Sequence, residues 1–339
     1  MNKLEAIIQK DILEILPKID FKELNGKTIL ITGASGLIGT YLLATMRELA
    51  DEGFKIQVIA LTQGGFPKYL SHFGENVKFI KGDLTNQKLL DSILKVDYII
   101  HAAGYGQPGK FLEDPTKTIE LNTTCTINLI KKLKTNGKFL FISTSEVYSG
   151  LETPPFKEEQ IGTTNTNHPR ACYIEGKRCG EAIVNAYRGK GVEAKSARLS
   201  LAYGPGTKKG DKRVLNAFIE KALGGKLELL DQGISKRTYC YVSDAVEVLW
   251  QILFFGKESV YNVGGISNTT IAQLAKMIGT SLDTPVIFPK NTTNHLQEAP
   301  TDVQLDMTKA VKEFKKTDYI PLNDGLERTI RWQQILYKT

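Results

Sequence analysis

The stretch Thr28-Ile29-Leu30-Ile31-Thr32-Gly33-Ala34-Ser35-Gly36-Leu37-Ile38-Gly39 decides the fold of this 339-residue chain. Its first five residues are typical of a buried strand, and a helical pattern follows them to about residue 50. The three glycines let the backbone turn sharply between the two elements and approach a pyrophosphate. Free N–H groups and the dipole at the helix N-terminus would favour that anion. The motif predicts a dinucleotide site at Gly33, Ser35, Gly36, Leu37, Ile38 and Gly39.

Strands and helices keep alternating beyond this motif. Apolar runs that indicate strands are separated by longer stretches with helical periodicity. Such alternation predicts an α/β fold, a doubly wound parallel (Rossmann) sheet with helices on both faces. The expected strands are 28–32, 55–61, 77–80, 97–101, 138–143 and 194–203, and long helices are expected at about 115–133 and 171–188.

The chain is expected to have three regions. Residues 1–26 form an extension with a helix at 3–16, whose apolar side chains share one stripe and which Pro17 stops. Residues 27–205 form the dinucleotide-binding domain. Residues 206–339, where the pattern is less regular, form mainly a smaller α/β domain that binds the substrate, with some segments returning to the sheet.

Composition argues against several classes of protein. Lys and Arg number 44 against 37 Asp and Glu, and this net charge of +7 is spread in short clusters that suit an anionic small ligand, so no nucleic-acid partner is expected. The four cysteines form no C-x-x-C pair and no His lies at zinc-ligand spacing, so no metal and no disulfide are expected. No apolar run approaches the roughly 20 residues that span a bilayer, which predicts a cytoplasmic protein without a membrane partner.

Strand ends carry further candidate cofactor residues. The second strand ends in Thr62-Gln63-Gly64, without the Asp or Glu that binds the adenosine ribose and without an arginine in its place, which favours NAD over NADP. Asp83 follows the third strand, where it is placed to meet the adenine. His101 ends the fourth strand and is expected to be structural. The cofactor candidates here are Asp83, Leu84, the small residues Ala102, Ala103 and Gly104, and Asn122 in the helix at 115–133.

A phenol and an ammonium group are expected side by side on the helix at 171–188. Tyr173 and Lys177 are four residues apart and therefore share one face. The pKa of an isolated tyrosine is about 10, but a neighbouring cation favours the phenolate and makes it a usable base near neutral pH. The strand at 138–143 delivers Thr144, Ser145 and Glu146 to the sheet edge where ligands bind. Thr144 and Ser145 are candidates to hydrogen-bond a substrate hydroxyl, and Glu146 is a candidate for proton transfer.

These motifs together resemble those of the extended short-chain dehydrogenase/reductases, specifically the NAD-dependent nucleotide-sugar epimerases, dehydratases and decarboxylases. The likeness covers about residues 27–335, because 237–244, 261–265 and 325–332 also look like segments of that family. The resemblance implies that Tyr173, as a phenolate held by Lys177, removes the proton from the sugar 4-hydroxyl while Thr144 binds the same oxygen. The C4 hydride then passes to NAD, and Lys177 also binds the nicotinamide ribose.

The resemblance also implies a substrate-binding set. Arg237 matches an arginine that contacts the substrate diphosphate, to which the bidentate guanidinium fork is well suited. Arg213 matches another region on the substrate side, and Tyr148 and Arg170 lie in motifs that carry the resemblance. Family members commonly dimerise through the two long helices, so a homodimer that binds a nucleotide-diphosphate sugar is implied.

The finer resemblance is to UDP-glucuronate decarboxylase, on Thr-Ser-Glu-Val-Tyr at 144–148 and Pro-Arg-Ala-Cys-Tyr-x-Glu-Gly-Lys-Arg at 169–178. The 4,6-dehydratases usually have an Asp where Ser145 stands, and serine is a poor acid. The decarboxylases have an arginine just before a C-terminal Asp-x-x-Lys-Ala segment, where this chain has Val303 and Gln304. Arg170, Lys110 and the lysines of 208–212 are the candidates to replace it. A 4-epimerase or 4,6-dehydratase is the alternative activity, and a dinucleotide-binding regulatory protein is the non-enzyme alternative.

Overall fold

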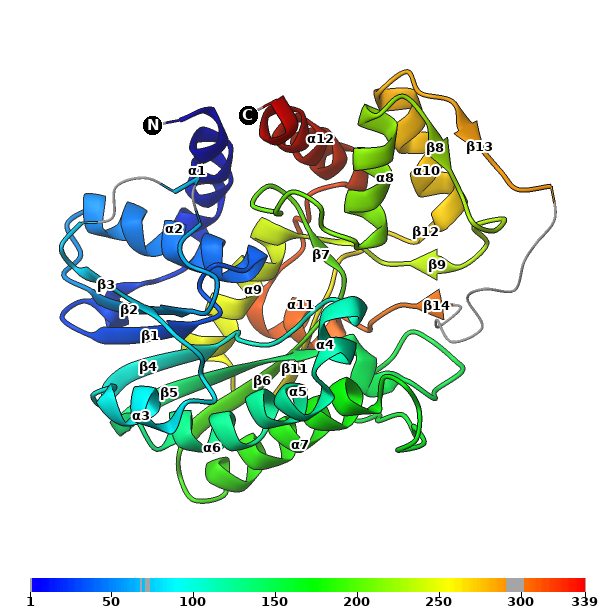
Figure 1. The fold of residues 1–339 in the computed structure, drawn as a ribbon. Helices are drawn as coiled ribbons and strands as arrows, with labels where there is room; N and C mark the ends of the chain where they lie inside the picture. The colour runs from blue at the N-terminus through cyan, green and yellow to red at the C-terminus, as the bar shows by residue number, and fades with distance from the viewer. Residues whose placement is uncertain (1, 68, 71–73, 291–301, 339) are drawn as a thin grey trace.

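The centre of the molecule is a seven-stranded, all-parallel sheet (Figure 1). The structure is a computed structural model that describes residues 2–67, 69–70, 74–290 and 302–338. Strand order is β11-β6-β5-β4-β1-β2-β3, so the direction of winding reverses between β1 and β4, where ligands bind in such sheets. The strands are β1 (Thr28–Thr32), β2 (Gln57–Thr62), β3 (Val77–Lys81), β4 (Val96–His101), β5 (Leu133–Thr144), β6 (Glu193–Leu199) and β11 (Val260–Val263).

Both faces of the sheet are covered by helices, which explains the apolar runs in the central strands β1, β2 and β4. Alternate residues of β1 enter different cores: Ile29 and Ile31 belong to one cluster and Leu30 to the other. One face carries α2 (Leu37–Asp51) and α9 (Val242–Phe255), and the other carries α3 (Gln87–Ser92), α5 (Pro115–Asn122), α6 (Thr124–Ile130) and α7 (Ala171–Arg188) (Figure 1). The predicted doubly wound sheet is confirmed.

Two expected elements are interrupted. The single helix expected at 115–133 is broken at Thr123, whose φ of −113° and ψ of −80° are not helical. Its hydroxyl donates to Ile119 O at 2.9 Å, the kind of local bond by which threonine competes with helix continuation. The strand expected at 194–203 also divides, because Leu201 has a φ of 37° and the following β7 (Ala202–Tyr203) pairs with β10 (Cys240–Tyr241) outside the main sheet.

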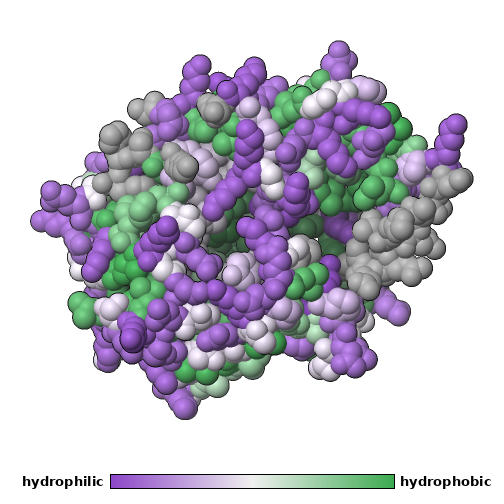
Figure 2. Space-filling model, in the orientation of Figure 1, coloured by the Kyte–Doolittle hydropathy of each residue, from purple (hydrophilic) through white to green (hydrophobic). Residues whose placement is uncertain are grey.

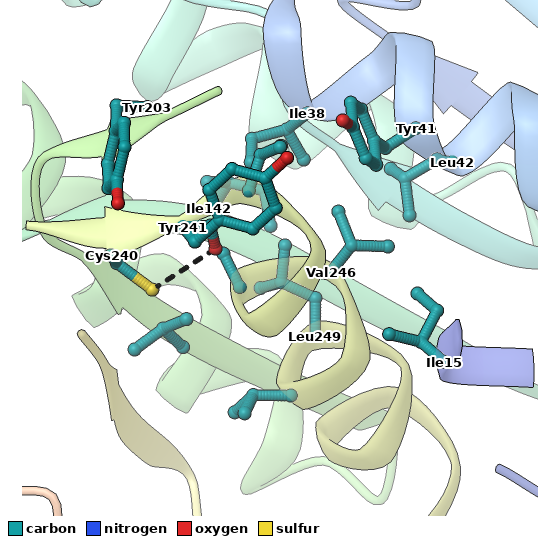
Figure 3. Packing of buried hydrophobic residues seen from close by; sticks show 14 of the residues in the cluster. Ile15, Ile38, Tyr41, Leu42, Ile142, Tyr203, Cys240, Tyr241, Val246 and Leu249 are labelled. Atoms are coloured by element: carbon teal, nitrogen blue, oxygen red, sulfur yellow. Dashed lines mark hydrogen bonds between the residues drawn. The ribbon is translucent and has the colours of Figure 1, made fainter. Parts of the chain in front are cut away.

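The N-terminal helix is confirmed as α1 (Lys3–Ile15), capped by Asn2 and followed by a 3₁₀ turn that contains Pro17. It packs between α2, α9 and the C-terminal helix α12 (Leu322–Lys338). Asp11 of α1 accepts hydrogen bonds from the hydroxyls of Tyr41 at 2.5 Å and Tyr241 at 2.7 Å. Figure 3 shows Ile15, Tyr41, Tyr241 and other apolar side chains from these elements in one core.

The remaining elements after residue 206 gather beside the sheet (Figure 1). The division at this residue stays a prediction, while α9 and β11 return to the sheet as such a division implies. None of the helices in the described ranges is both long and apolar enough to cross a membrane. The elements of this group are α8 (Val214–Leu223), β8 (Leu227–Glu228), β9 (Lys236–Arg237), β12 (Thr269–Thr270), α10 (Ile271–Ser281), β13 (Val286–Ile287) and β14 (Asp302–Val303), and α11 (Thr308–Phe314) lies against β11.

Candidate active site

The turn between β1 and α2 has no room for side chains at two of its glycines. A Cβ on Gly33, whose φ is +69°, would lie 2.4 Å from Ala102 O, and a Cβ on Gly39 would lie 2.3 Å from Gly33 O. Gly36 is the N-cap of α2, and no side chain among the described residues caps it. Ser35 is turned aside, with its Oγ 2.6 Å from Thr62 Oγ1. The first turn of α2 therefore keeps backbone N–H groups for an anion, as a dinucleotide requires.

A second part of the predicted cofactor site lies where the loop after β4 meets α5 and α7. A Cβ on Gly104 would lie 3.6 Å from Lys177 Nζ and 3.8 Å from Asn122 Oδ1. The Asn122 oxygen is buried and has no hydrogen-bond partner in the part of the chain that the structure describes. The Lys177 ammonium group, a donor, and the Asn122 oxygen, an acceptor without a partner, thus lie near the backbone of Gly104, which has no side chain. This arrangement fits the hydroxyl groups of a nucleotide ribose.

The residues after β3 are placed differently from one another. Asp83 is partly exposed and forms an ion pair with Lys117. Partial burial acts to raise the pKa of Asp83, but Lys117 and Thr85 outweigh it and lower that pKa overall. The Leu84 side chain is buried in the core, so only its backbone is left for the expected cofactor contact. The ring of His101 is 2.8 Å from Thr32 Oγ1 and 3.0 Å from Leu121 O, and burial lowers its pKa to about 3, which supports its structural role.

Tyr173 and Lys177 lie on the buried face of α7. The Tyr173 ring stacks on Phe111 of α4 (Pro108–Glu113) with centroids 4.6 Å apart, and the Thr144 side chain is near enough to the Tyr173 hydroxyl to act on its pKa, in the lowering direction. Burial, and after it the charge of Glu146, raises the pKa of Tyr173 to about 12. Burial lowers the pKa of Lys177 to about 7, and its Nζ donates to Ile142 O at 2.7 Å. Desolvation of both groups was not predicted from the sequence, and it opposes the favourable effect that a neighbouring cation has on the phenolate.

The end of β5 brings the next candidates to Tyr173. Thr144 Oγ1 accepts from the backbone N–H of Glu146 at 3.3 Å and so starts the turn Ser145–Tyr148, with Ser145 nearly buried. The Glu146 carboxylate forms an ion pair with Arg170, the residue that precedes α7. Burial raises the pKa of Glu146, and the charges of Arg170, His168 and Arg237 offset this only in part.

Three arginines from separate segments act on this group through their charges. The charges of Arg170 and Arg213 act on Tyr173, and those of Arg170 and Arg237 act on Glu146. Arg213 is bound to Asp211 through Nη2 at 2.7 Å and Nε at 3.0 Å. Figure 2 shows that this face of the molecule is hollowed near its centre, between the sheet and the C-terminal elements. Such a cluster of guanidinium groups suits a ligand with several negative charges.

Tyr148 is not brought into this group. Its hydroxyl donates to Asn262 Oδ1 at 2.7 Å and accepts from Arg198 Nη1 at 2.9 Å, and the side chain is buried. Arg198 also holds Glu181, which accepts from Ser143 Oγ at 2.5 Å. Sequence reasoning missed Glu181, although it lies four residues after Lys177 on the same helical face and its charge raises the pKa of that lysine. It also missed Phe111, for which no pattern gave a signal.

Comparison with known proteins places this site in a family. The sequence profile of the NAD dependent epimerase/dehydratase family matches residues 29–264. The chain belongs to this family. NAD, the cofactor expected from the sequence, is thereby confirmed as the cofactor of the family, and the glycine turn and the Gly104 region described above fit it.

Curated members of the epimerase/dehydratase family resemble the chain over most of its length. UDP-glucuronic acid decarboxylase 1 of Xenopus tropicalis is 32% identical over 333 residues, which cover 96% of this chain and 76% of that protein. UDP-glucuronic acid decarboxylase 1 of Danio rerio is 32% identical over 324 residues, 93% of this chain and 75% of that protein. The family resemblance predicted from the motifs is confirmed.

Solved structures of the family share the fold. An epimerase from Methanothermobacter thermautotrophicus has a TM-score of 0.81 at 20% identity and covers 98% of both chains. UDP-glucose 4-epimerase of Thermotoga maritima has a TM-score of 0.77 at 22% identity, covering 91% of this chain and 99% of its own. UDP-glucuronic acid 4-epimerase of Bacillus cereus has a TM-score of 0.74 at 23% identity, covering 91% and 100%.

Proposed function

We propose that this family member is a UDP-glucuronate decarboxylase whose first step is oxidation of the sugar at C4. The observation that carries the proposal is the meeting of Tyr173, Thr144 and the Glu146–Arg170 pair in one site. Two curated relatives that align over more than nine tenths of the chain are named UDP-glucuronic acid decarboxylases.

We place the sugar 4-hydroxyl between the neighbouring hydroxyls of Tyr173 and Thr144. Tyr173 takes the hydroxyl proton as general base, with Thr144 holding the oxygen in place. Bound NAD supplies the acceptor for the C4 hydride, which makes C4 a ketone. Lys177 follows Tyr173 by one turn of α7 and lies beside the Gly104 region, and its proposed role is to supply the positive charge that the forming phenolate needs.

Carbon dioxide leaves from the oxidised sugar because a 4-keto uronate is a β-keto acid. The electron pair of the bond between C5 and the carboxyl carbon moves toward the C4 oxygen, where the hydroxyls of Tyr173 and Thr144 stabilise the negative charge. Glu146, whose pKa is raised by burial, is the proposed donor that returns a proton to C5. The product is UDP-xylose if the hydride is returned to C4 and a proton to its oxygen, and the 4-keto sugar if the hydride stays on the cofactor.

The proposed substrate site extends to Arg213 and Arg237, which would bind the diphosphate from the region after residue 206. A homodimer through α5 and α7, which the family resemblance implies, belongs to the same proposal. The four cysteines are free, as a reducing compartment allows, and we propose a cytoplasmic location on that ground.

A 4-epimerase is the second candidate, and one observation favours it. Val303, in the register where the decarboxylases carry an arginine, pairs with Arg237 across β14 and β9. Val303 itself offers no charge to a sugar carboxylate. An enzyme acting on a neutral hexose would not need one.

Release of carbon dioxide from UDP-glucuronate by the NAD-loaded protein tests the proposal. The variant Tyr173→Phe keeps the ring that stacks on Phe111 and loses the base, so the rate of release should fall roughly a thousandfold. Unchanged release in this variant would contradict the role of Tyr173. Conversion of UDP-glucose to its C4 epimer, without release from UDP-glucuronate, would favour the second candidate.

A further inference from the structure

The ion pair of Glu146 and Arg170 is incomplete in a way that points to a ligand. Arg170 Nη2 contacts Glu146 Oε1. Arg170 Nε and Glu146 Oε2 are both buried and have no hydrogen-bond partner among the described residues. A guanidinium has five N–H donors and binds a carboxylate best through two of them. Buried polar atoms without partners are costly, so this pair is poised to exchange partners.

We propose that Arg170 binds the carboxylate of UDP-glucuronate, which displaces Glu146 from the guanidinium. The inference rests on the proposed function and names the residue that gives the site its selectivity for an acidic sugar. Arg170 would then replace the arginine that the decarboxylases carry near the position of Val303.

The position of Arg170 matches the position of the sugar carboxylate. The guanidinium lies over the Phe111 ring, 5.7 Å from its centroid, and Tyr173 stacks on the same ring. The carboxyl carbon of a uronate is attached to C5, the neighbour of C4. A sugar whose 4-hydroxyl is held at Tyr173 therefore presents its carboxylate close to the site of reaction, where the charge of Arg170 already acts on Tyr173.

The other cations are engaged or exposed. Arg213 is held by two bonds to the carboxylate of Asp211. Arg237 donates to Lys236 O at 2.7 Å, beside Val303. Lys110 and Lys208 are exposed to solvent, where an ion pair contributes little. Arg170 alone among these candidates combines burial of its Nε with a charge near Tyr173 and an unused donor.

The exchange also changes the surroundings of Glu146. Its neighbours are Arg170, His168, Arg237 and Tyr173, and Arg170 is the one in direct contact. When the substrate carboxylate takes Arg170, the buried Glu146 loses its closest cation and gains a negative neighbour. A carboxyl group in that setting binds a proton more readily, as the proposed donor to C5 must.

The experiment is calorimetric titration of NAD-loaded protein with UDP-glucuronate and with UDP-glucose, in a Tyr173→Phe background so that neither ligand is consumed. Adding Arg170→Gln should weaken UDP-glucuronate binding about a hundredfold and leave UDP-glucose binding within about threefold, because only the acidic sugar uses this residue. Retained UDP-glucose binding also shows that the variant is folded.

Two matched variants sharpen the test. Glu146→Gln removes the competitor for Arg170 and should strengthen UDP-glucuronate binding relative to UDP-glucose, the opposite of the Arg170→Gln result. Arg213→Gln, on the diphosphate side, should weaken both ligands alike. Equal effects of Arg170→Gln on both ligands, or a Glu146→Gln change that leaves their affinity ratio unaltered, would overturn the inference.

Release of carbon dioxide by the unsubstituted protein distinguishes failure of the proposed function from failure of the role of Arg170. If the unsubstituted protein releases no carbon dioxide from UDP-glucuronate, the proposed function and the role of Arg170 both fall. If it does release carbon dioxide while Arg170→Gln keeps its preference for UDP-glucuronate, only the role of Arg170 is wrong.

Discussion

Burial sets the acid–base behaviour of the Tyr173 and Lys177 pair. The spacing of the two residues was enough to predict that they share a helical face next to Thr144. Their desolvation was not predictable, because it depends on Phe111 and on strand β5, which lie far away in the sequence. For the same reason Tyr148, which belongs to a recognisable motif, is buried against Arg198 instead of facing the substrate group.

The lowered pKa of Lys177, about 7, predicts a pH-dependent cost to stability. Between pH 7 and 10.5 the unfolded chain binds a proton at this residue that the folded chain does not, so this group makes stability rise with pH. Lys177→Met, which does not titrate, should therefore be more stable than the natural chain at pH 7. Its advantage should shrink by up to about 1.4 kcal/mol for each pH unit above 7.

Denaturant unfolding of both proteins at pH 7, 8 and 9 measures this difference. Comparing the two proteins cancels the contributions of other titrating groups. Parallel stability profiles would show that Lys177 keeps an ordinary pKa in the folded protein.

The turn between β1 and α2 is an element that could be predicted from the sequence alone. Its strand, glycines and helix were predicted from local sequence because each is defined by neighbouring residues. The central strands β1, β2 and β4 were found for the same reason, since burial on both faces makes them apolar runs. The break at Thr123 was not predicted, because a single residue gives no periodic pattern. The two-residue strands were missed because they are too short to show one; these are β8, β9, β12, β13 and β14.

Gly39→Ala tests the close approach in this turn. The new Cβ would lie 2.3 Å from Gly33 O, so the turn must shift, and we expect NAD affinity to fall at least tenfold together with thermal stability. Gly109→Ala is the matched control, because a Cβ there would meet no described atom within 4 Å beyond its chain neighbours and the backbone of its own helix. Calorimetric titration with NAD and thermal unfolding provide the readouts. Equal NAD affinity in the two variants would show that the turn has more room than the structure gives it.

At the scale of the whole molecule, α1 joins segments from opposite ends of the chain. Asp11 accepts from Tyr41, Tyr241 and Arg328, which belong to α2, β10 and α12. The sequence predicted the helix from its apolar stripe, but the partners of Asp11 follow only from the tertiary fold. The group is a structural link between the sheet and the C-terminal helix.

Asp11→Ala should destabilise the protein by about 2 to 4 kcal/mol, since two buried tyrosine hydroxyls lose their acceptor. Arg328 keeps Glu14 as a partner, so its charge is not stranded. Lys10→Ala, at the exposed neighbouring position, should change stability little. Chemical denaturation of the two variants measures both values, and equal stabilities would contradict the role assigned to Asp11.

The most direct test of the account is mass spectrometry of the product formed from UDP-glucuronate and NAD, with UDP-glucose, dTDP-glucose and GDP-mannose in parallel. The proposed function predicts loss of the mass of one carbon dioxide from UDP-glucuronate, and no such loss with Tyr173→Phe. An unchanged UDP-glucuronate, together with an isomer or loss of water from one of the other sugars, would contradict it.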